Sequence, residues 1–334
     1  MMSSRKTLAL SLVIFSTLWS TLAWAHGKPS DKPHTTVETV PNVVVSIAPL
    51  HSLVAGVMEG LGEPKLLLKG NQTPHHYQLS PSDAQALAQA NVVIYTSKKT
   101  EIYIPPLLAA IPERKPLTIE AMTIPGITLY PVAVKEGAPK GIPVSDMHFW
   151  LDPMNAIAFT QHIATILSEK DPDHKSFYAV NAKKQNERLK TLYQDTHTLL
   201  KSKAGKGGSL VASYASYHPV LQYFEKRYQI KPGLVITRTP ESGATMSEMG
   251  ALESAIKSGA VTCLFSEPQF SPKLLTKMAD TYEQAHIHTL DPIGATLEPG
   301  ATLYGELIRN MAGTISKCLK PTLKKEPAIA PAGN

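Results

Sequence analysis

The sequence predicts an α/β protein of two similar lobes, each a parallel sheet flanked by helices, joined by a long linking helix with a cleft between the lobes. Short apolar runs rich in β-branched residues alternate with helical patterns in both halves of the chain, an order typical of a parallel sheet covered on both faces. Between the halves, residues 154 to 203 carry helical patterns and no strand pattern. A chain of 334 residues also exceeds what one hydrophobic core usually serves.

The N-terminus has the three regions of a secretory signal peptide. Arg5 and Lys6 precede an apolar run over residues 8–22, and the small-residue site Ala23-Trp24-Ala25 ends it. We therefore expect cleavage after residue 25 and a periplasmic address in a Gram-negative cell. A membrane span is the alternative, but the run is short for a bilayer and is interrupted by Ser and Thr. Residues 26–41 are polar and lack apolar periodicity, which predicts a disordered lead-in.

The first lobe is predicted to span residues 42–150. Its strands are expected at 43–47, 66–68, 92–95 and 117–119. A helical pattern with Leu50, Val54 and Val57 follows the first strand. Another helix is expected to open near Ser82-Asp83, because these side chains can cap the free backbone N–H groups of a first turn.

Residues 151–172 are predicted to form the linking helix. Phe159, Ile163 and Leu167 recur there at helical spacing and would form one apolar stripe. A second helical stretch is expected to continue to about residue 203. Together these helices are long enough to cross between lobes.

The second lobe is predicted to span residues 173–320. Beyond the helical stretch its strands are expected at 210–212, 234–236 and 261–265, with helices through 223–224 and over 247–257. A final helix presents Tyr304, Leu307 and Ile315 on one face and ends near Cys318. Residues 321–334 are rich in Pro, Lys and Ala, which predicts a disordered tail.

Cysteine count and charge narrow the class of protein. The chain has two cysteines, Cys263 and Cys318. An even pair in a chain addressed to an oxidising compartment favours a disulfide over two free thiols. The formal net charge of +6 is modest and scattered, and no basic run is interleaved with aromatic residues, so the sequence does not indicate a nucleic-acid interface.

Three of the twelve histidines stand out by position. Ligand sites of open α/β sheets lie beyond the carboxyl ends of strands. His75, His148 and His218 lie in or beside strand-to-helix connections, and Asp291 also follows a predicted strand. Imidazole and carboxylate are zinc ligands, but these residues are too far apart in sequence to form a local metal motif, so the site would have to be assembled by the fold. For Asp291 a turn cap and a ligand are equally good interpretations.

Other histidines have simpler interpretations. His162, His174 and His197 lie among polar neighbours in helical stretches, where a solvated side chain is expected. His286 and His288 alternate in a predicted strand, so they share one face and are interpreted as structural.

Several segments resemble a known family. They are residues 46–54, the Thr73-Pro74-His75-His76-Tyr77 run and its continuation to Asp83, the Asp146-Met147-His148 run and its continuation to Pro153, His218 with residues 223–226, and residues 265–270 and 290–294. In this order they resemble the solute-binding proteins of ABC importers for zinc and manganese, most closely the periplasmic zinc-binding type. The resemblance extends from about residue 43 to residue 320.

The resemblance implies a function and a ligand set. It implies capture of Zn²⁺ by His75, His148 and His218 in the cleft, with Asp291 as a possible fourth ligand, and delivery to an ABC importer permease by a monomer. Manganese-selective members generally place a carboxylate at the position of His218, so zinc is the expected metal. The family also implies a rigid helix between the lobes and a Cys263–Cys318 disulfide.

The chain departs from this family in two ways. Many zinc-binding members carry a loop rich in His and acidic residues before the Asp-Met-His segment, whereas residues 132–145 contain no His. A secondary metal site in that loop is therefore not expected. Ser80 stands where relatives commonly have a basic residue, and the sequence alone assigns this no consequence.

Three other functions were weighed. A manganese or other divalent-metal binding protein of the same importer class is the nearest alternative. A zinc hydrolase would also use three His and a water, but beyond Glu267 the sequence offers no evident general base, so no enzyme is expected. An adhesin is disfavoured because no Cys for lipid attachment follows the apolar run and the chain has no repeats.

Overall fold

The computed structural model describes residues 40–72, 77, 79–111, 115–132, 145–204, 210–237 and 243–321. The predicted signal peptide, nearly all of the predicted lead-in and residues 322–334 of the predicted tail lie outside these ranges. Within them, no helix has both the length and the apolar character needed to cross a membrane.

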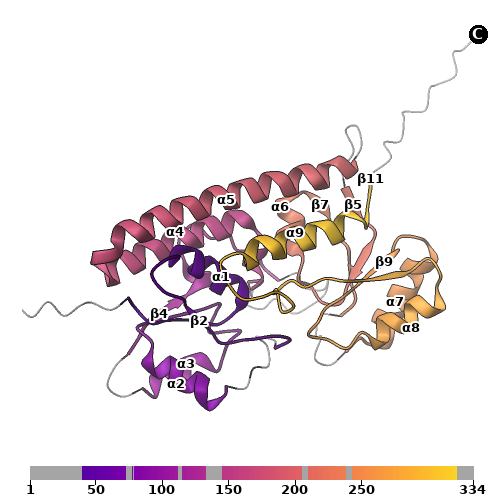
Figure 1. Cartoon of the computed structure of the whole chain (residues 1–334). Coiled ribbons are helices and arrows are strands. Elements are labelled where there is room, and N and C mark those ends of the chain that lie inside the picture. Colours follow the sequence, from indigo (N-terminus) through magenta and orange to yellow (C-terminus); the bar gives the residue numbers. More distant parts are fainter. Residues whose placement is uncertain are drawn as a thin grey trace, which may run out of the picture. The chain divides into compact units, whose positions relative to one another are not determined.

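The first lobe contains a four-stranded parallel sheet. Its strands are β1 (Val43–Val45), β2 (Lys65–Leu66), β3 (Val92–Tyr95) and β4 (Leu117–Glu120), in the order β2-β1-β3-β4. β1 and β3 are buried along their whole length, which explains their unbroken apolar sequences. The helices are α1 (Ala48–Val57), α2 (Pro81–Gln89) and α3 (Ile104–Ala109), with α2 and α3 on the opposite side of the sheet from α1 (Figure 1). Short 3-10 turns, η1 (Ala121–Thr123) and η2 (Phe149–Leu151), follow the last strand.

The second lobe contains two sheets where one was expected. Four parallel strands have the order β10-β9-β6-β8, namely β6 (Tyr214–Ser216), β8 (Leu234–Val235), β9 (Cys263–Ser266) and β10 (His286–Thr289). A smaller sheet has the order β11-β5-β7, with β5 (Leu210–Ala212) parallel to β7 (Ile230–Lys231) and antiparallel to β11 (Leu319–Pro321). The helices of this lobe are α6 (Gln222–Arg227), α7 (Met246–Lys257) and α8 (Lys273–Thr281).

Ser213 separates the two sheets of the second lobe. Its backbone N–H donates to the carbonyl of Cys318, and its own carbonyl accepts from the N–H of Cys263. The chain therefore leaves the small sheet at β5 and enters the four-stranded sheet at β6. A strand was predicted at 210–212 alone, because the buried Tyr-Ala-Ser segment that forms β6 has no apolar alternation.

Two long helices connect the lobes. α4 (Pro153–Lys170) and α5 (Lys175–Lys201) pack against each other, with the turn η3 (Pro172–His174) between them and the turn η4 (Ser202–Ala204) after α5. α5 also contacts α1 of the first lobe and the last helix, α9 (Leu303–Ser316) (Figure 1). The predicted helical segments 151–172 and 173–203 thus correspond to α4 and α5, and the longer α5 extends furthest toward the second lobe.

One continuous hydrophobic core joins the two lobes. It contains Val44 of β1, Phe159 of α4, Leu189 of α5, Phe265 of β9 and Ile308 of α9, all almost fully buried. A smaller core under α7 and α8 contains residues such as Leu252 and Leu275. Because the main core includes residues of both lobes, the lobes are packed together by protein contacts along the helices that connect them.

The predicted disulfide is confirmed. Cys263 of β9 and Cys318, which follows α9, are bridged, with their Cα atoms 5.9 Å apart. The bridge ties the final helix to the central sheet of the second lobe.

The position of Ser80 now has a structural explanation. Its side chain accepts a hydrogen bond from the backbone N–H of Asp83, and the Asp83 carboxylate accepts one from the backbone N–H of Ser80. This reciprocal pair is a capping box, which satisfies two N–H groups at the start of α2. The residue serves as a helix cap in this chain.

Candidate metal centre

Two of the three predicted histidine ligands meet at the junction of the lobes. His148 lies just before η2 at the end of the first lobe, and His218 follows β6 in the second. Both are buried, with exposed fractions of 8% and 6%. Their Nε2 atoms lie 3.4 Å apart, although the residues are separated by 70 positions in the sequence.

An acid holds the ring of His148. Oδ1 of the buried Asp146 accepts a hydrogen bond from the His148 backbone N–H at 3.0 Å and lies 2.7 Å from the ring Nδ1. The Asp146 carbonyl in turn accepts from the hydroxyl of Tyr223, on α6 of the second lobe, at 2.8 Å. Asp146 therefore fixes the ring of His148, while Tyr223 fixes the backbone of Asp146.

A second acid holds the ring of His218. Oε1 of Glu267 lies 2.7 Å from His218 Nδ1, and Glu267 is only 4% exposed. Glu267 directly follows β9, and β9 is the parallel neighbour of β6. The carboxyl ends of parallel neighbours lie at one edge of the sheet, which is why these two side chains meet.

These contacts determine which nitrogens face the junction. A carboxylate can only accept hydrogen bonds, so in each neutral imidazole the proton is expected on Nδ1, facing Asp146 or Glu267. Both Nε2 lone pairs are then directed toward a common point. Two nitrogens bound to one tetrahedral zinc at 2.0–2.1 Å are separated by about 3.4 Å, which equals the observed separation. Carboxylate partners of this kind orient metal-binding histidines and raise their basicity.

The third predicted histidine, His75, lies outside the described residues. Residues 133–144, the loop in which no second metal site was expected, also lie outside them. Hydrogen bonds hold the described residues on either side of His75. Gln72 Oε1 accepts from the backbone N–H of Lys69 at 2.8 Å, and the Tyr77 hydroxyl donates to Asp83 at 2.7 Å. The role of His75 as a zinc ligand stays a prediction.

Asp291 makes the contacts of a turn cap. Its Oδ1 accepts hydrogen bonds from the backbone N–H groups of Gly294 and Ala295, and its Oδ2 accepts from the N–H and the hydroxyl of Thr296. These four bonds organise the loop after β10, which is one of the two interpretations that the sequence left open. Its role as a fourth ligand remains a prediction.

Neither carboxylate was predicted from the sequence to hold a histidine ring. Asp146 was named only within the segment that resembles the family, and Glu267 only as a base for hydrolysis. Asp146 could have been found, because it stands two residues before a candidate ligand. Glu267 and His218 are 49 positions apart, and only the pairing of β6 with β9 brings them together.

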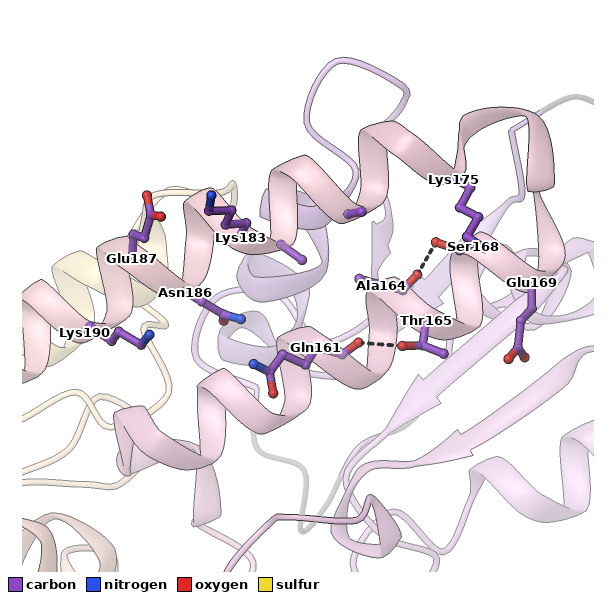
Figure 2. Close-up of a pocket in the computed structure, with 12 residues that line it drawn as sticks. Gln161, Ala164, Thr165, Ser168, Glu169, Lys175, Lys183, Asn186, Glu187 and Lys190 are labelled. Atoms are coloured by element: carbon purple, nitrogen blue, oxygen red, sulfur yellow. Dashed lines mark hydrogen bonds between the residues drawn. The ribbon is translucent and has the colours of Figure 1, made fainter.

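A groove of about 640 Å³ between α4 and α5 is separate from the histidine pair (Figure 2). Most of the residues that line it are polar or charged, among them Gln161, Ser168, Lys175, Lys183, Glu187 and Lys190. The hydroxyls of Thr165 and Ser168 donate back to carbonyls of their own helix, as Figure 2 shows. No histidine lines this groove, and the convergent ligand chemistry lies at the histidine pair.

The fold and the histidine pair define the class of two-lobed α/β binding proteins with a ligand site at the lobe junction. The chain belongs to the family of the zinc-uptake complex component A, periplasmic, whose family model matches residues 43–318. It is 33% identical over 314 residues to the high-affinity zinc uptake system protein ZnuA of Brucella abortus (strain 2308), with 83% of this chain and 91% of that protein covered. The family predicted from the sequence is thereby confirmed.

Solved structures show the same fold. The crystal structure of a ZnuA matches with a TM-score of 0.70 at 24% identity, covering 84% of this chain and 99% of that one. The solute-binding protein FpvC of Pseudomonas aeruginosa in complex with Mn²⁺ matches with a TM-score of 0.70 at 18% identity, covering 84% and 98%. The predicted two-lobed α/β fold is confirmed, and a fold shared with a manganese complex does not by itself select the metal.

Proposed function

We propose that this protein captures Zn²⁺ in the periplasm and delivers it to the membrane permease of an ABC importer. The observation that carries the proposal is the pair of buried imidazoles, one from each lobe, whose Nε2 atoms are spaced as in a tetrahedral zinc shell. The high-affinity zinc uptake protein of Brucella abortus, one third identical in sequence, supports zinc as the cargo. A signal peptide over residues 1–25 and a monomeric state are part of the proposal.

The proposed ligands are His75, His148 and His218. Zinc binds neutral imidazole, so capture requires that the ligand nitrogens carry no proton. Asp146 and Glu267 each face Nδ1, so the single proton of the neutral ring lies on Nδ1 and Nε2 is the nitrogen presented to the ion. A water or the Asp291 carboxylate would complete four-coordination. Each lobe contributes ligands, so the bound ion would add a cross-link to the existing lobe contacts.

A zinc hydrolase is less well supported by the same contacts. Glu267, the one base considered for such an enzyme, is 2.7 Å from His218 Nδ1 and is engaged in holding that ring. A general base must be within reach of a metal-bound water. The contacts of Glu267 therefore favour a positioning role, which agrees with the family's role in transport.

The site is tested by calorimetric zinc titration of the metal-free chain. We expect one tight zinc per chain, and we expect His75→Ala, His148→Ala and His218→Ala each to weaken binding at least a hundredfold, because each removes one of few inner-sphere bonds. His162→Ala, on α4 and away from the pair, is the matched control and should bind as the parent does. Unchanged affinity in all three variants would remove the basis of the proposed function.

A further inference from the structure

A second group of potential metal ligands consists of the two disulfide-bonded cysteines and a neighbouring histidine. The ligand atoms of Cys263, Cys318 and His288 all lie within 4.8 Å of one another. His286 pairs with Cys263 in register between β10 and β9, and His288 pairs with Phe265. Register partners on neighbouring strands, and alternate residues on one strand, point to the same face of a sheet. The two histidines and Cys263 therefore share one face, which Cys318 meets through the bridge.

The backbone of both cysteines is also held by hydrogen bonds that do not involve the bridge. Cys263 lies in β9, which is hydrogen-bonded to β10 on one side and to β6 on the other. The carbonyl of Cys318 accepts from both the backbone N–H and the hydroxyl of Ser213, each at 2.9 Å. Cleavage of the S–S bond would thus leave two thiols facing each other beside an imidazole.

The spacing of these atoms suits zinc. Two thiolates on a tetrahedral zinc at about 2.3 Å are separated by about 3.8 Å. Cα atoms 5.9 Å apart allow this separation through side-chain rotation alone. Cys263 and Cys318 are buried, whereas His288 is half-buried, so His288 is the most solvent-accessible of the three side chains.

We propose that reduction of the disulfide creates a second zinc site, distinct from the histidine pair, with Cys263, Cys318 and His288 as ligands. His286, the register partner of Cys263, lies on the same face of the sheet and is the candidate fourth ligand. Two thiolates with two imidazoles form one of the ligand sets of structural zinc sites.

The chemistry balances as two steps. A dithiol reductant attacks the bridge, the S–S bond breaks, and the reductant becomes a disulfide while the chain gains two thiols. Zinc then binds both sulfurs and the neutral imidazole, and two protons leave with no electron transfer. The bridged state and the zinc-bound state exclude each other, so zinc on the reduced chain should protect the pair from reoxidation.

The test compares oxidised and reduced forms of the full chain. Dithiothreitol reduces the protein and is removed by anaerobic gel filtration before Co²⁺ or Zn²⁺ is added. We expect one zinc per oxidised chain and two per reduced chain, a thiolate-to-cobalt charge-transfer band in the reduced form only, and at least tenfold slower reoxidation with zinc present. In a His148→Ala/His218→Ala background the second site is measured alone, so its result is independent of the proposed function.

Variants assign the ligands. His288→Ala should weaken the second site at least tenfold, and Cys263→Ser/Cys318→Ser should abolish the cobalt band while leaving one zinc at the histidine pair. His162→Ala is the control. The proposal is overturned if the reduced chain loses its native circular dichroism, if it binds no more metal than the oxidised chain, or if His288→Ala leaves the cobalt band and the affinity unchanged.

Discussion

At the scale of single residues, the metal centre depends on acids that are not themselves proposed ligands. Asp146 and Glu267 each face the Nδ1 of one histidine at 2.7 Å and are nearly inaccessible to solvent. Burying a carboxylate is costly unless it is hydrogen-bonded. The burial of both acids at the lobe junction is explained by the orientation they impose on the imidazoles.

Glu267→Gln tests this role. The amide keeps the shape of the side chain but loses its negative charge, so the ring of His218 is less firmly oriented. We expect zinc affinity to fall by about tenfold to a hundredfold, the usual cost of removing such a partner. Isothermal titration measures it, with Glu283→Gln, an exposed acid on the same lobe, as the control. Equal losses in both variants would mean that the effect is one of general charge.

His218→Glu tests metal choice. The parent would present nitrogen ligands, which suit zinc, whereas Mn²⁺ favours oxygen ligands and lies at the weak end of the divalent series. We expect the parent to prefer zinc over manganese by at least about a hundredfold, and His218→Glu to reduce that preference. Competition dialysis against equal free concentrations, read by elemental analysis, gives the ratio. A parent that retains manganese in preference would contradict the assignment of zinc.

At the scale of elements, the carboxyl end of β3 is fixed by one buried acid. Glu101 is fully buried, and its Oε2 accepts hydrogen bonds from the backbone N–H groups of Thr96 and Ser97. Removal from water raises the pKa of Glu101 to about 7, against the partial compensation of these bonds. The loop between β3 and α3 is therefore held by a group that titrates near neutral pH.

Glu101→Gln should reveal this titration. The folded-state pKa of Glu101 lies above its unfolded value of 4.5, so its contribution to stability is fully present below pH 4.5 and is lost as the pH rises through 7. Relative to the parent, the Gln variant should gain roughly 3 kcal/mol in unfolding free energy between pH 4 and pH 8. Urea unfolding across this range measures the gain. Glu59→Gln, an exposed acid beside Lys184, should show no comparable change.

The short elements were the hardest to predict. α3 begins Ile-Pro-Pro and has only six residues, and α8 buries only Leu275. β7 and β11 contain two and three residues and belong to the small sheet. Such segments carry too few buried residues to show a periodicity, so their conformation depends on the neighbours they pack against.

At the scale of the whole molecule, α6 attaches the second lobe to the end of the first. Arg227 donates two hydrogen bonds at 2.6 Å to the carboxylate of Asp152, which also caps α4 through the backbone N–H of Met154. One turn earlier on α6, Tyr223 contacts the carbonyl of Asp146. The interlobe contacts of α6 thus flank the segment that carries His148.

Arg227→Met should destabilise the protein. Asp152 is 1% exposed and would lose its charged partner, a change that typically costs about 3–5 kcal/mol for a buried pair. We expect a loss near the lower end, since the Arg227 side chain is 28% exposed. Urea unfolding of the metal-free protein gives the value, and Arg188→Met on the exposed surface of α5 is the control. Adding Asp152→Asn should restore part of the loss. If it restores none, the pairing of these two charges is not the cause.

The sequence by itself determined the alternation of strands and helices, the cysteine pair and the candidate ligands. These features follow from burial and periodicity within a segment, as in Val92–Tyr95, which is the same in prediction and structure. Only the tertiary structure decided that His148 meets His218, that Glu267 faces His218, and that Ser213 divides the second lobe into two sheets. The physical reason is that these outcomes depend on hydrogen bonds and packing between residues 49 or more positions apart, which no local pattern records.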